Sequence, residues 1–170
     1  MLEIARPSPE AVVVGTGFYT VSDAARLLKT PGRNINRWLG GYSYEASGER
    51  VRMPPLWRAQ IPRLGDRLEI GFRDLIELRF VQAFIKAGLG LHVIRKCFET
   101  ARDIVADERP FSTRRFQTDG RTIFLDTLHQ SGVAELLDLR KSQFVLKPII
   151  ERTFKDLDFE DDVVARWRPF

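Results

Sequence analysis

Cysteine and histidine are scarce in this 170-residue sequence, which has Cys97 alone and two histidines, His92 and His129. One cysteine cannot form an internal disulfide, and none of these residues has a second metal ligand at the spacing used by zinc sites. We therefore expect a reducing compartment, the cytoplasm, and no cofactor or metal. Cys97 is predicted to be a small buried hydrophobic residue, and neither histidine is predicted to be catalytic.

Long apolar runs are also missing. No stretch approaches the roughly 18 apolar residues of a membrane span, and residues 1–17 lack the basic start and apolar run of an export signal. The sequence contains no Ser/His/Asp set, no phosphate-cradling glycine loop and no zinc motif. We therefore expect neither a membrane protein, nor an exported protein, nor an enzyme.

Charge is unevenly distributed along the chain, although the net charge of +4 is modest. Residues 26–63 carry eight Lys or Arg against Glu45 and Glu49 alone, whereas acidic residues are frequent from Asp156 onwards. A local excess of basic residues is typical of a nucleic-acid-binding surface. The acidic end is predicted to be solvated rather than to bind a metal, because its carboxylates alternate with Leu157 and Phe159.

Two short helices are predicted within the basic region. Thr20 and Asp23 have the spacing of a capping box, which predicts a helix from Val21 that ends at Pro31-Gly32. A second helix is predicted over residues 33–39, with Ile35, Trp38 and Leu39 facing inward. Its outer face would then carry Arg33, Asn34, Asn36 and Arg37. Two helices joined by a tight turn can place the second in the major groove, where Arg can pair with guanine and Asn with adenine.

A hairpin is predicted to follow these helices, with strands over residues 40–44 and 51–53 on either side of the turn-forming residues 46–48. Such a wing would carry Arg50 and Arg52 towards phosphates, accompanied by Tyr42 and Tyr44. Trp57 stands between two prolines and an arginine, where an aromatic ring can either anchor the wing or rest against DNA. The sequence leaves both alternatives open.

Two longer helices are predicted next, over residues 75–87 with Asp74 as the cap and over residues 91–105, after a short strand at 68–72. The second helix has an apolar stripe at helical spacing, which is either internal core or the seam of an antiparallel homodimer. We favour the dimer. The stripe consists of Leu91, Ile94, Phe98, Ala101 and Val105.

The C-terminal third is predicted to be a small α+β unit. Asp119-Gly120 within residues 111–125 is a strong signal for a tight hairpin. A short helix or turn at 133–137, a strand at 143–146 and a helix that starts at Pro148 and runs to about Leu157 are expected to follow. The apolar terminus from Val163 is expected either to continue into a further segment or to pack against another surface.

Residues 18–28 and 35–39 together resemble the opening helices of the MerR-like winged helix-turn-helix family, and residues 72–80 and 87–95 resemble its third and fourth helices. The hairpin region and residues 150–159 are similar to the middle of VapB-type antitoxins that have a MerR-like front end. This resemblance implies a protein that binds and silences a PIN-domain ribonuclease toxin and represses its own operon. Members of that group carry a further small helical module, so the resemblance also implies a truncated or processed chain.

We therefore predict a mainly α fold with small β parts (α+β). The expected divisions are an N-terminal arm (1–18), a MerR-like winged helix-turn-helix with two supporting helices (19–108) and a small α/β-hairpin unit (109–170). The predicted function is a homodimeric, DNA-binding antitoxin that acts on a palindromic operator and a PIN-domain toxin. Two alternatives stay open: a regulator with a ligand pocket lined by Phe111, Phe116 and Phe124, and a pure protein-interaction module.

Overall fold

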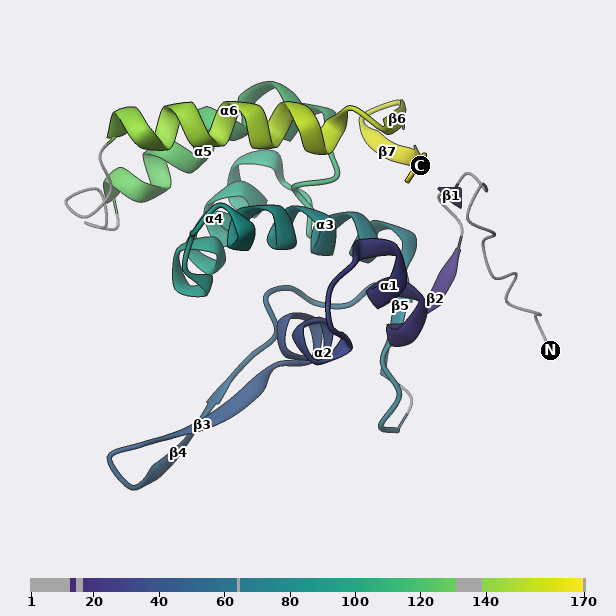
Figure 1. Cartoon of the computed structure of the whole chain (residues 1–170), viewed down its shortest axis with the longest axis vertical. Coiled ribbons are helices and arrows are strands. Elements are labelled where there is room, and N and C mark those ends of the chain that lie inside the picture. Colours follow the sequence, from purple (N-terminus) through teal and green to yellow (C-terminus); the bar gives the residue numbers. More distant parts are fainter. Residues whose placement is uncertain (1–12, 15–16, 64, 131–138, 170) are drawn as a thin grey trace.

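The computed structural model describes residues 13–14, 17–63, 65–130 and 139–169. Helices form most of the molecule, with small antiparallel sheets at its edges, so the predicted α+β fold class is confirmed. Helices α3 and α4 occupy the middle of the molecule, α5 and α6 cover one side of them, and α1, α2 and a projecting hairpin lie on the other side (Figure 1).

The predicted N-terminal helix pair is present. Helix α1 (Val21–Leu28) begins where expected, because the Thr20 hydroxyl accepts a hydrogen bond of 3.0 Å from the Asp23 amide. The chain leaves α1 through Lys29 in the left-handed region and enters α2 (Gly32–Gly40). Helix α2 buries its three predicted inward residues, Ile35, Trp38 and Leu39.

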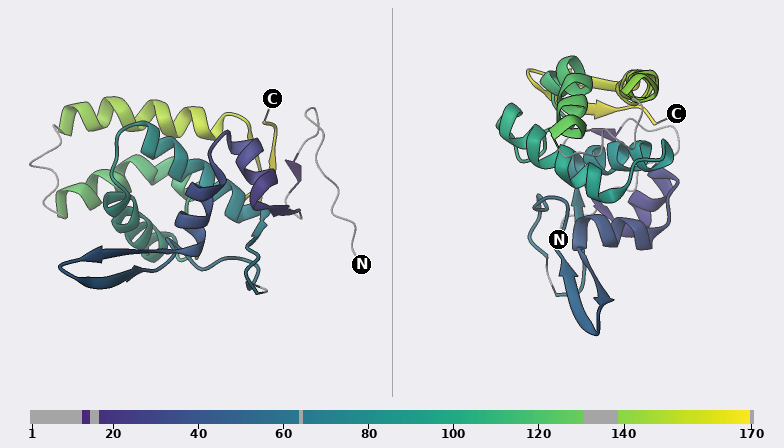
Figure 2. Two further views of the ribbon diagram at one scale, coloured as in Figure 1. Left: turned by 60° about the horizontal axis from the view of Figure 1, so that its bottom comes forward. Right: turned by 90° about the vertical axis from the view of Figure 1, so that its left-hand side faces the viewer.

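Strands β3 (Tyr42–Ala46) and β4 (Glu49–Met53) form the predicted hairpin. Ser47 and Gly48 both have positive φ, the backbone geometry that matches a two-residue turn to the right-handed twist of the strands. The hairpin extends away from the helical body (Figure 2). It is therefore positioned to contact a separate molecule.

The third helix begins earlier than predicted. Strand β2 (Phe18–Thr20) pairs with β5 (Glu69–Gly71), and α3 (Phe72–Lys86) follows β5 directly. Gly71 occupies the position before the helix and provides no side-chain cap. The prediction that Asp74 caps the helix was wrong, because its carboxylate is fully buried and binds side chains and backbone groups from distant segments.

Helix α4 (Leu91–Val105) has the predicted bounds, but the predicted hairpin around Asp119-Gly120 was wrong. Residues there belong to α5 (Arg114–Gln130), whose buried face includes Phe116, Gly120 and Phe124. These side chains recur at intervals of four residues, which is the spacing of one helix face. A Cβ on Gly120 would lie 3.0 Å from the Phe116 ring, so glycine serves here as a small core residue.

The predicted strand at residues 143–146 and the predicted helix start at Pro148 were also wrong. Both lie inside α6 (Leu139–Phe154), and Pro148 is exposed within that helix. The predicted element at residues 133–137 falls outside the described residues. Strand β7 (Val163–Trp167) pairs with β6 (Leu157–Glu160) and β1 (Val13–Val14), and it buries Val164 and Trp167. The apolar terminus thus packs against other segments of the same chain.

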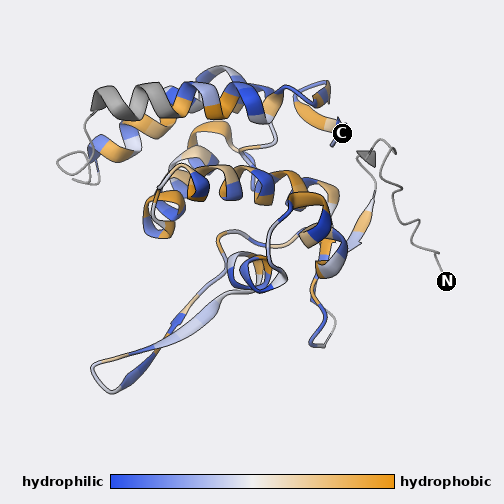
Figure 3. Ribbon diagram, viewed as in Figure 1, coloured by the Kyte–Doolittle hydropathy of each residue, from blue (hydrophilic) through white to orange (hydrophobic). Residues whose placement is uncertain are grey.

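One cluster of phenylalanine rings connects the helices on both sides of residue 108. Phe80 of α3 is fully buried, and its ring lies 5.8 Å from that of Phe111 and 4.8 Å from that of Phe154. Phe84 contacts Phe124 at a ring separation of 4.8 Å. Hydrophobic residues accordingly face inward between the helical layers (Figure 3). The regions that the sequence separated at 108 therefore share a hydrophobic core.

The proposed ligand pocket among phenylalanines is occupied by the rings themselves. Phe111, Phe116 and Phe124 have no exposed surface, and the rings of Phe111 and Phe116 are 4.7 Å apart. The space between them is therefore filled by side chains, so these three residues do not line the pocket that would have favoured the ligand-responsive alternative.

The apolar stripe of α4 lies in the core of the chain, the alternative that the sequence left open beside a dimer seam. Ile94, Phe98 and Ala101 are fully buried, whereas Leu91 and Val105 are partly buried at the two ends of the helix. A second chain could reach the three central side chains only if the core opened. Any dimer of the folded chain therefore needs other contacts.

Cys97, in the middle of α4, is also fully buried. Burial raises the pKa of its thiol well above the ordinary value, while a hydrogen bond with the Thr127 side chain acts in the opposite direction. The thiol is therefore unreactive in the folded protein, in agreement with its prediction as a buried hydrophobic residue.

Glu77 of α3 is a fully buried carboxyl group, and burial raises its pKa well above the ordinary value. Its Oε1 accepts a hydrogen bond of 3.0 Å from the Phe111 amide, whereas its Oε2 has no hydrogen-bond partner. A raised pKa in the folded state means that stability is fully present below the unfolded pKa of about 4.3 and is lost as the pH rises through the folded value.

We expect Glu77→Gln to flatten this pH dependence, because the amide is uncharged and its oxygen can still accept from Phe111. Urea unfolding of both proteins between pH 5 and pH 8 measures it. The variant should be at least as stable as the parent at the upper end of the range. If the free energy of unfolding changed equally with pH in the two proteins, Glu77 would not be the source of the pH dependence.

Among the described residues, no helix is both long and apolar enough to cross a membrane.

Candidate nucleic-acid interface

The exposed side of α2 carries most of its predicted base-reading residues. Arg33, Asn36 and Arg37 are exposed and recur at intervals of three and four residues, so they share one face of the helix. Asn34 is half-buried, and its side-chain amide lies at the 3.5 Å limit of a hydrogen bond to the Thr30 hydroxyl. Asn34 is thus less available than the other three.

Arg37 connects α2 to the hairpin. Its guanidinium lies over the Tyr42 ring, 4.1 Å from the ring centroid, which is a cation–π contact. The Tyr42 and Tyr44 rings are 6.2 Å apart. The contact holds the last turn of the helix beside the first strand of the hairpin.

The hairpin divides its predicted contact residues between two faces. Directly opposed residues of an antiparallel pair have side chains on the same face. Tyr42 is opposite Met53 and Tyr44 is opposite Val51, whereas Arg52 is opposite Ser43 and Arg50 is opposite Glu45. The tyrosines and the arginines therefore point to opposite sides of the strands, a separation that follows from the register.

A hollow of about 520 Å³ lies between the end of α2 and the arginine strand, lined by Gly40, Gly41, Tyr42, Ser43, Arg50 and Arg52. Gly41 has a φ of +82°, and a Cβ there would come within 2.7 Å of the Met53 carbonyl. The close approach of helix end and strand thus requires glycine at this position.

The segment after the hairpin is fixed to two helices. The Leu56 amide donates to the Trp38 carbonyl at 2.9 Å, and the Arg95 guanidinium of α4 donates to the carbonyls of Pro54 at 2.9 Å and Pro55 at 3.1 Å. Trp57 is buried and stacks on Phe98 with 5.1 Å between the rings. Of the two alternatives for Trp57, the structure gives the anchor.

Asp74 of α3 binds the same segment, the residues that follow the hairpin. Its Oδ1 accepts hydrogen bonds from Trp57 Nε1 at 2.8 Å and Arg109 Nε at 2.9 Å, and its Oδ2 accepts from the Gln60 amide at 2.8 Å. Arg109 also donates to the Arg58 carbonyl at 2.8 Å. Sequence reasoning missed this cluster, because its members are 14 to 35 residues apart and no local pattern connects them.

Arg63 is a further basic residue that sequence reasoning left out of the interface. Its Nη1 lies 3.7 Å from the position that a Cβ on Gly40 would take, so its guanidinium is beside the end of α2. The basic charge count of residues 26–63 was the only signal that pointed to it.

The interface arginines take part in none of the ion pairs found among the described residues. Within the part of the chain that the structure describes, no ion pair involves Arg33, Arg37, Arg50 or Arg52. Unpaired, exposed guanidinium groups on a helix and an adjoining hairpin are available for phosphates and base edges.

Comparisons with known proteins found similarity both in sequence and in fold. No protein-family model matches the chain. Over 156 residues, 86% of its length, the chain is 26% identical to a protein of Mycobacterium tuberculosis (strain ATCC 25618 / H37Rv) named "Putative antitoxin VapB45". The match covers 65% of that protein, so the chain spans a little under two thirds of its curated relative's length.

The structure is similar to the crystal structure of Rv2018 from Mycobacterium tuberculosis, with a TM-score of 0.64 and 21% sequence identity. This match covers 86% of the chain and 66% of Rv2018. At this identity the likeness establishes a shared fold.

Proposed function

We propose that the chain is the antitoxin of a type II toxin–antitoxin pair, which represses its own operon and neutralises a PIN-domain ribonuclease. The observation that carries the DNA-binding part is the group of unpaired, exposed arginines on α2 and the adjoining β3–β4 hairpin. The similarity to VapB45 supports the antitoxin part.

In this proposal α1, α2 and the hairpin act as a MerR-like winged helix-turn-helix. Helix α2 enters the major groove, which is wide enough for one helix, and Arg33, Asn36 and Arg37 reach base edges. The arginine face of the hairpin, with Arg50 and Arg52, contacts phosphates and adds affinity without sequence preference. Tyr42 and Tyr44 then support Arg37 from the other face of the strands.

The operator would be palindromic if the protein binds it as a homodimer, since the two-fold axis of the protein would match that of the DNA. Because the central residues of the α4 stripe are buried in the chain, we place such a dimer on other surfaces. Sedimentation analysis with and without operator DNA measures this, and a monomer under both conditions would contradict it.

For the DNA part we expect the double variant Arg33→Ala/Arg37→Ala to lose its preference for the chain's own upstream DNA over unrelated DNA. The variant Arg50→Ala/Arg52→Ala should instead weaken binding to both DNAs and reduce the slope of log affinity against log salt by about two units. Titrations of both DNAs across a salt series separate the two effects.

The matched control is Arg121→Ala, because this arginine is exposed on α5, on the opposite side of the molecule from α2. It should bind both DNAs as the parent does. Salt-independent binding by the parent, or equal losses in all three variants, would count against a DNA-reading role.

For the toxin part, the exposed acidic turn between β6 and β7 is the surface that would cover a basic ribonuclease cleft. Residues 150–170 include Phe154 and Trp167, which belong to the core, so substitutions within the turn test toxin contact without removing core side chains. We expect the triple variant Glu160→Gln/Asp161→Asn/Asp162→Asn to co-purify less PIN-domain ribonuclease than the parent and to bind DNA normally.

Asp126→Asn is the control for the triple variant, because Asp126 is exposed on α5. It should co-purify with the ribonuclease as the parent does. Full co-purification and neutralisation by the triple variant would place toxin contact elsewhere.

A further inference from the structure

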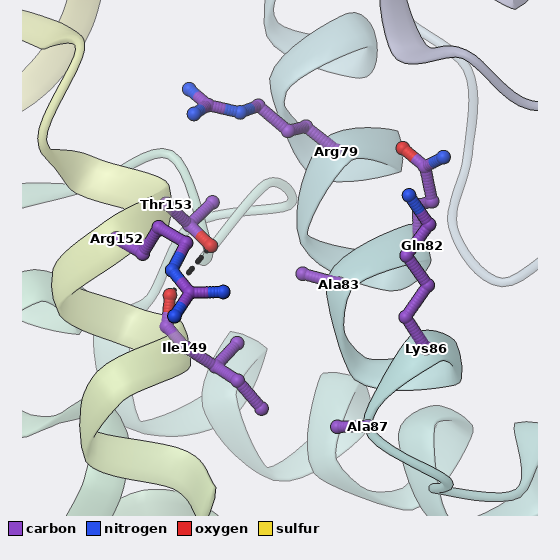
Figure 4. A pocket seen from close by; sticks show the side chains of 8 residues that line it. All are labelled: Arg79, Gln82, Ala83, Lys86, Ala87, Ile149, Arg152 and Thr153. Atoms are coloured by element: carbon purple, nitrogen blue, oxygen red, sulfur yellow. Dashed lines mark hydrogen bonds between the residues drawn. The ribbon is translucent and has the colours of Figure 1, made fainter.

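A cleft between α3 and α6, remote from the hairpin, is lined mainly by basic and small side chains. Its volume is about 370 Å³. Figure 4 shows Arg79 extending from α3 towards α6 and Arg152 extending from α6 towards α3. The lining residues are Arg79, Gln82, Ala83, Lys86, Ala87, Ile149, Arg152 and Thr153.

The charge in this cleft is incompletely balanced. Among the described residues that line it, three are cationic and none is acidic. The carboxylate of Asp156 forms an ion pair with one of these cations, at 3.7 Å from Arg79 Nη2. Three positive charges against one negative charge leave a net charge of two positive.

Arg79 lacks part of its hydrogen bonding. Its side chain is 17% exposed, its guanidinium lies 5.0 Å from the centroid of the Trp167 ring, and its Nη1 is buried without a hydrogen-bond partner. A buried donor without an acceptor is costly, and more so on a charged group. Burial also lowers the pKa of Arg79, whereas the nearby Asp156 carboxylate acts in the opposite direction.

The helix dipoles explain only part of this arrangement. Basic residues are favourable in the last turn of a helix, where Lys86 of α3 and Arg152 of α6 are found. Arg79 lies in the middle of α3, so the dipole gives no reason for its position or for its free nitrogen.

We infer that this cleft binds a small molecule that carries a phosphate group. A phosphate monoester has a charge of about −1.5 to −2 at pH 7 and offers three acceptor oxygens, which matches the excess positive charge of the cleft. Arginine is suited to this contact because its planar guanidinium can bind phosphate through two parallel hydrogen bonds. The volume leaves room for a further group against Ala83, Ala87 and Ile149, since small-molecule pockets start at about 300 Å³.

The test is isothermal titration calorimetry of the full chain with two probes, inorganic phosphate and glucose 6-phosphate. Glucose and sodium chloride at equal ionic strength serve as blanks. We expect saturable binding of glucose 6-phosphate and weaker binding of inorganic phosphate. The reverse order of affinities would identify free phosphate as the ligand and overturn the inference that the ligand is a larger phosphorylated molecule.

Arg152→Gln and Lys86→Gln are the informative variants, because both side chains are exposed and the fold does not depend on them. Each should lower the affinity about tenfold, while Arg121→Gln on α5 should leave it unchanged. Heat with sodium chloride equal to that with either probe, absence of saturable heat, or equal affinity in all three variants would overturn the inference. The experiment needs neither DNA nor toxin, so its failure is distinguishable from failure of the proposed function.

Discussion

Replacing Phe80 by alanine should lower the free energy of unfolding by about 3–5 kcal/mol. Phe80 has no exposed surface, and its ring contacts four others: Phe84, Phe111, Phe116 and Phe154. The substitution would leave a cavity where helices from both halves of the chain meet. Urea unfolding monitored by far-ultraviolet circular dichroism measures the loss.

Ile85→Ala is the matched control, because Ile85 lies on the same helix with 36% of its surface exposed. Its cost should be smaller, about 1–2 kcal/mol, because about a third of the side chain is already exposed to solvent. A similarly small loss for Phe80→Ala would mean that the core can close around the cavity. Two separate transitions in the parent would contradict the shared core on which the prediction rests.

Removing the Asp74 carboxylate should cost about 3–5 kcal/mol, the range expected when one partner of a buried ion pair is lost. Asp74→Ala would leave the Arg109 guanidinium, the Trp57 indole and the Gln60 amide without their acceptor. Urea unfolding measures the stability. Because this segment follows the hairpin directly, DNA affinity should fall as well, even though Asp74 is buried.

Glu108→Ala provides the comparison, since Glu108 is 58% exposed and lies 3.9 Å from Arg102. Surface pairs of this kind contribute roughly 0–1 kcal/mol. If Asp74→Ala lowered the free energy of unfolding as little as Glu108→Ala does, water would be able to replace the hydrogen bonds of the Asp74 carboxylate. If its stability fell while DNA affinity stayed constant, the hairpin would not depend on its anchor.

Local signals predicted the N-terminal half well. The Thr20 cap, the stop at Pro31-Gly32 and the turn at Ser47-Gly48 are each determined within a few residues, so α1, α2 and the hairpin were found near their observed bounds. The opposite faces of the hairpin could not be assigned, because they depend on which strand residues are paired.

The C-terminal third was mispredicted because a strong local signal competed with a weaker periodic one. Asp119-Gly120 favours a tight turn, whereas Phe116, Gly120 and Phe124 share a helix face. Burial of those aromatic rings against α3 outweighs the turn preference. The Asp74 cluster was out of reach for a different reason: its hydrogen bonds join segments whose proximity exists only in the folded chain.

The buried thiol of Cys97 is an intrinsic probe of how often the core opens. An alkylating reagent can reach this sulfur only when α4 separates from the core, and the sequence contains no other cysteine to react first. If the core recloses faster than the reagent reacts, the labelling rate reports the free energy of that opening. Bound DNA or toxin should slow the alkylation of Cys97 by the factor by which it stabilises the fold. The alkylation rate of this one side chain therefore reports the binding of either proposed partner.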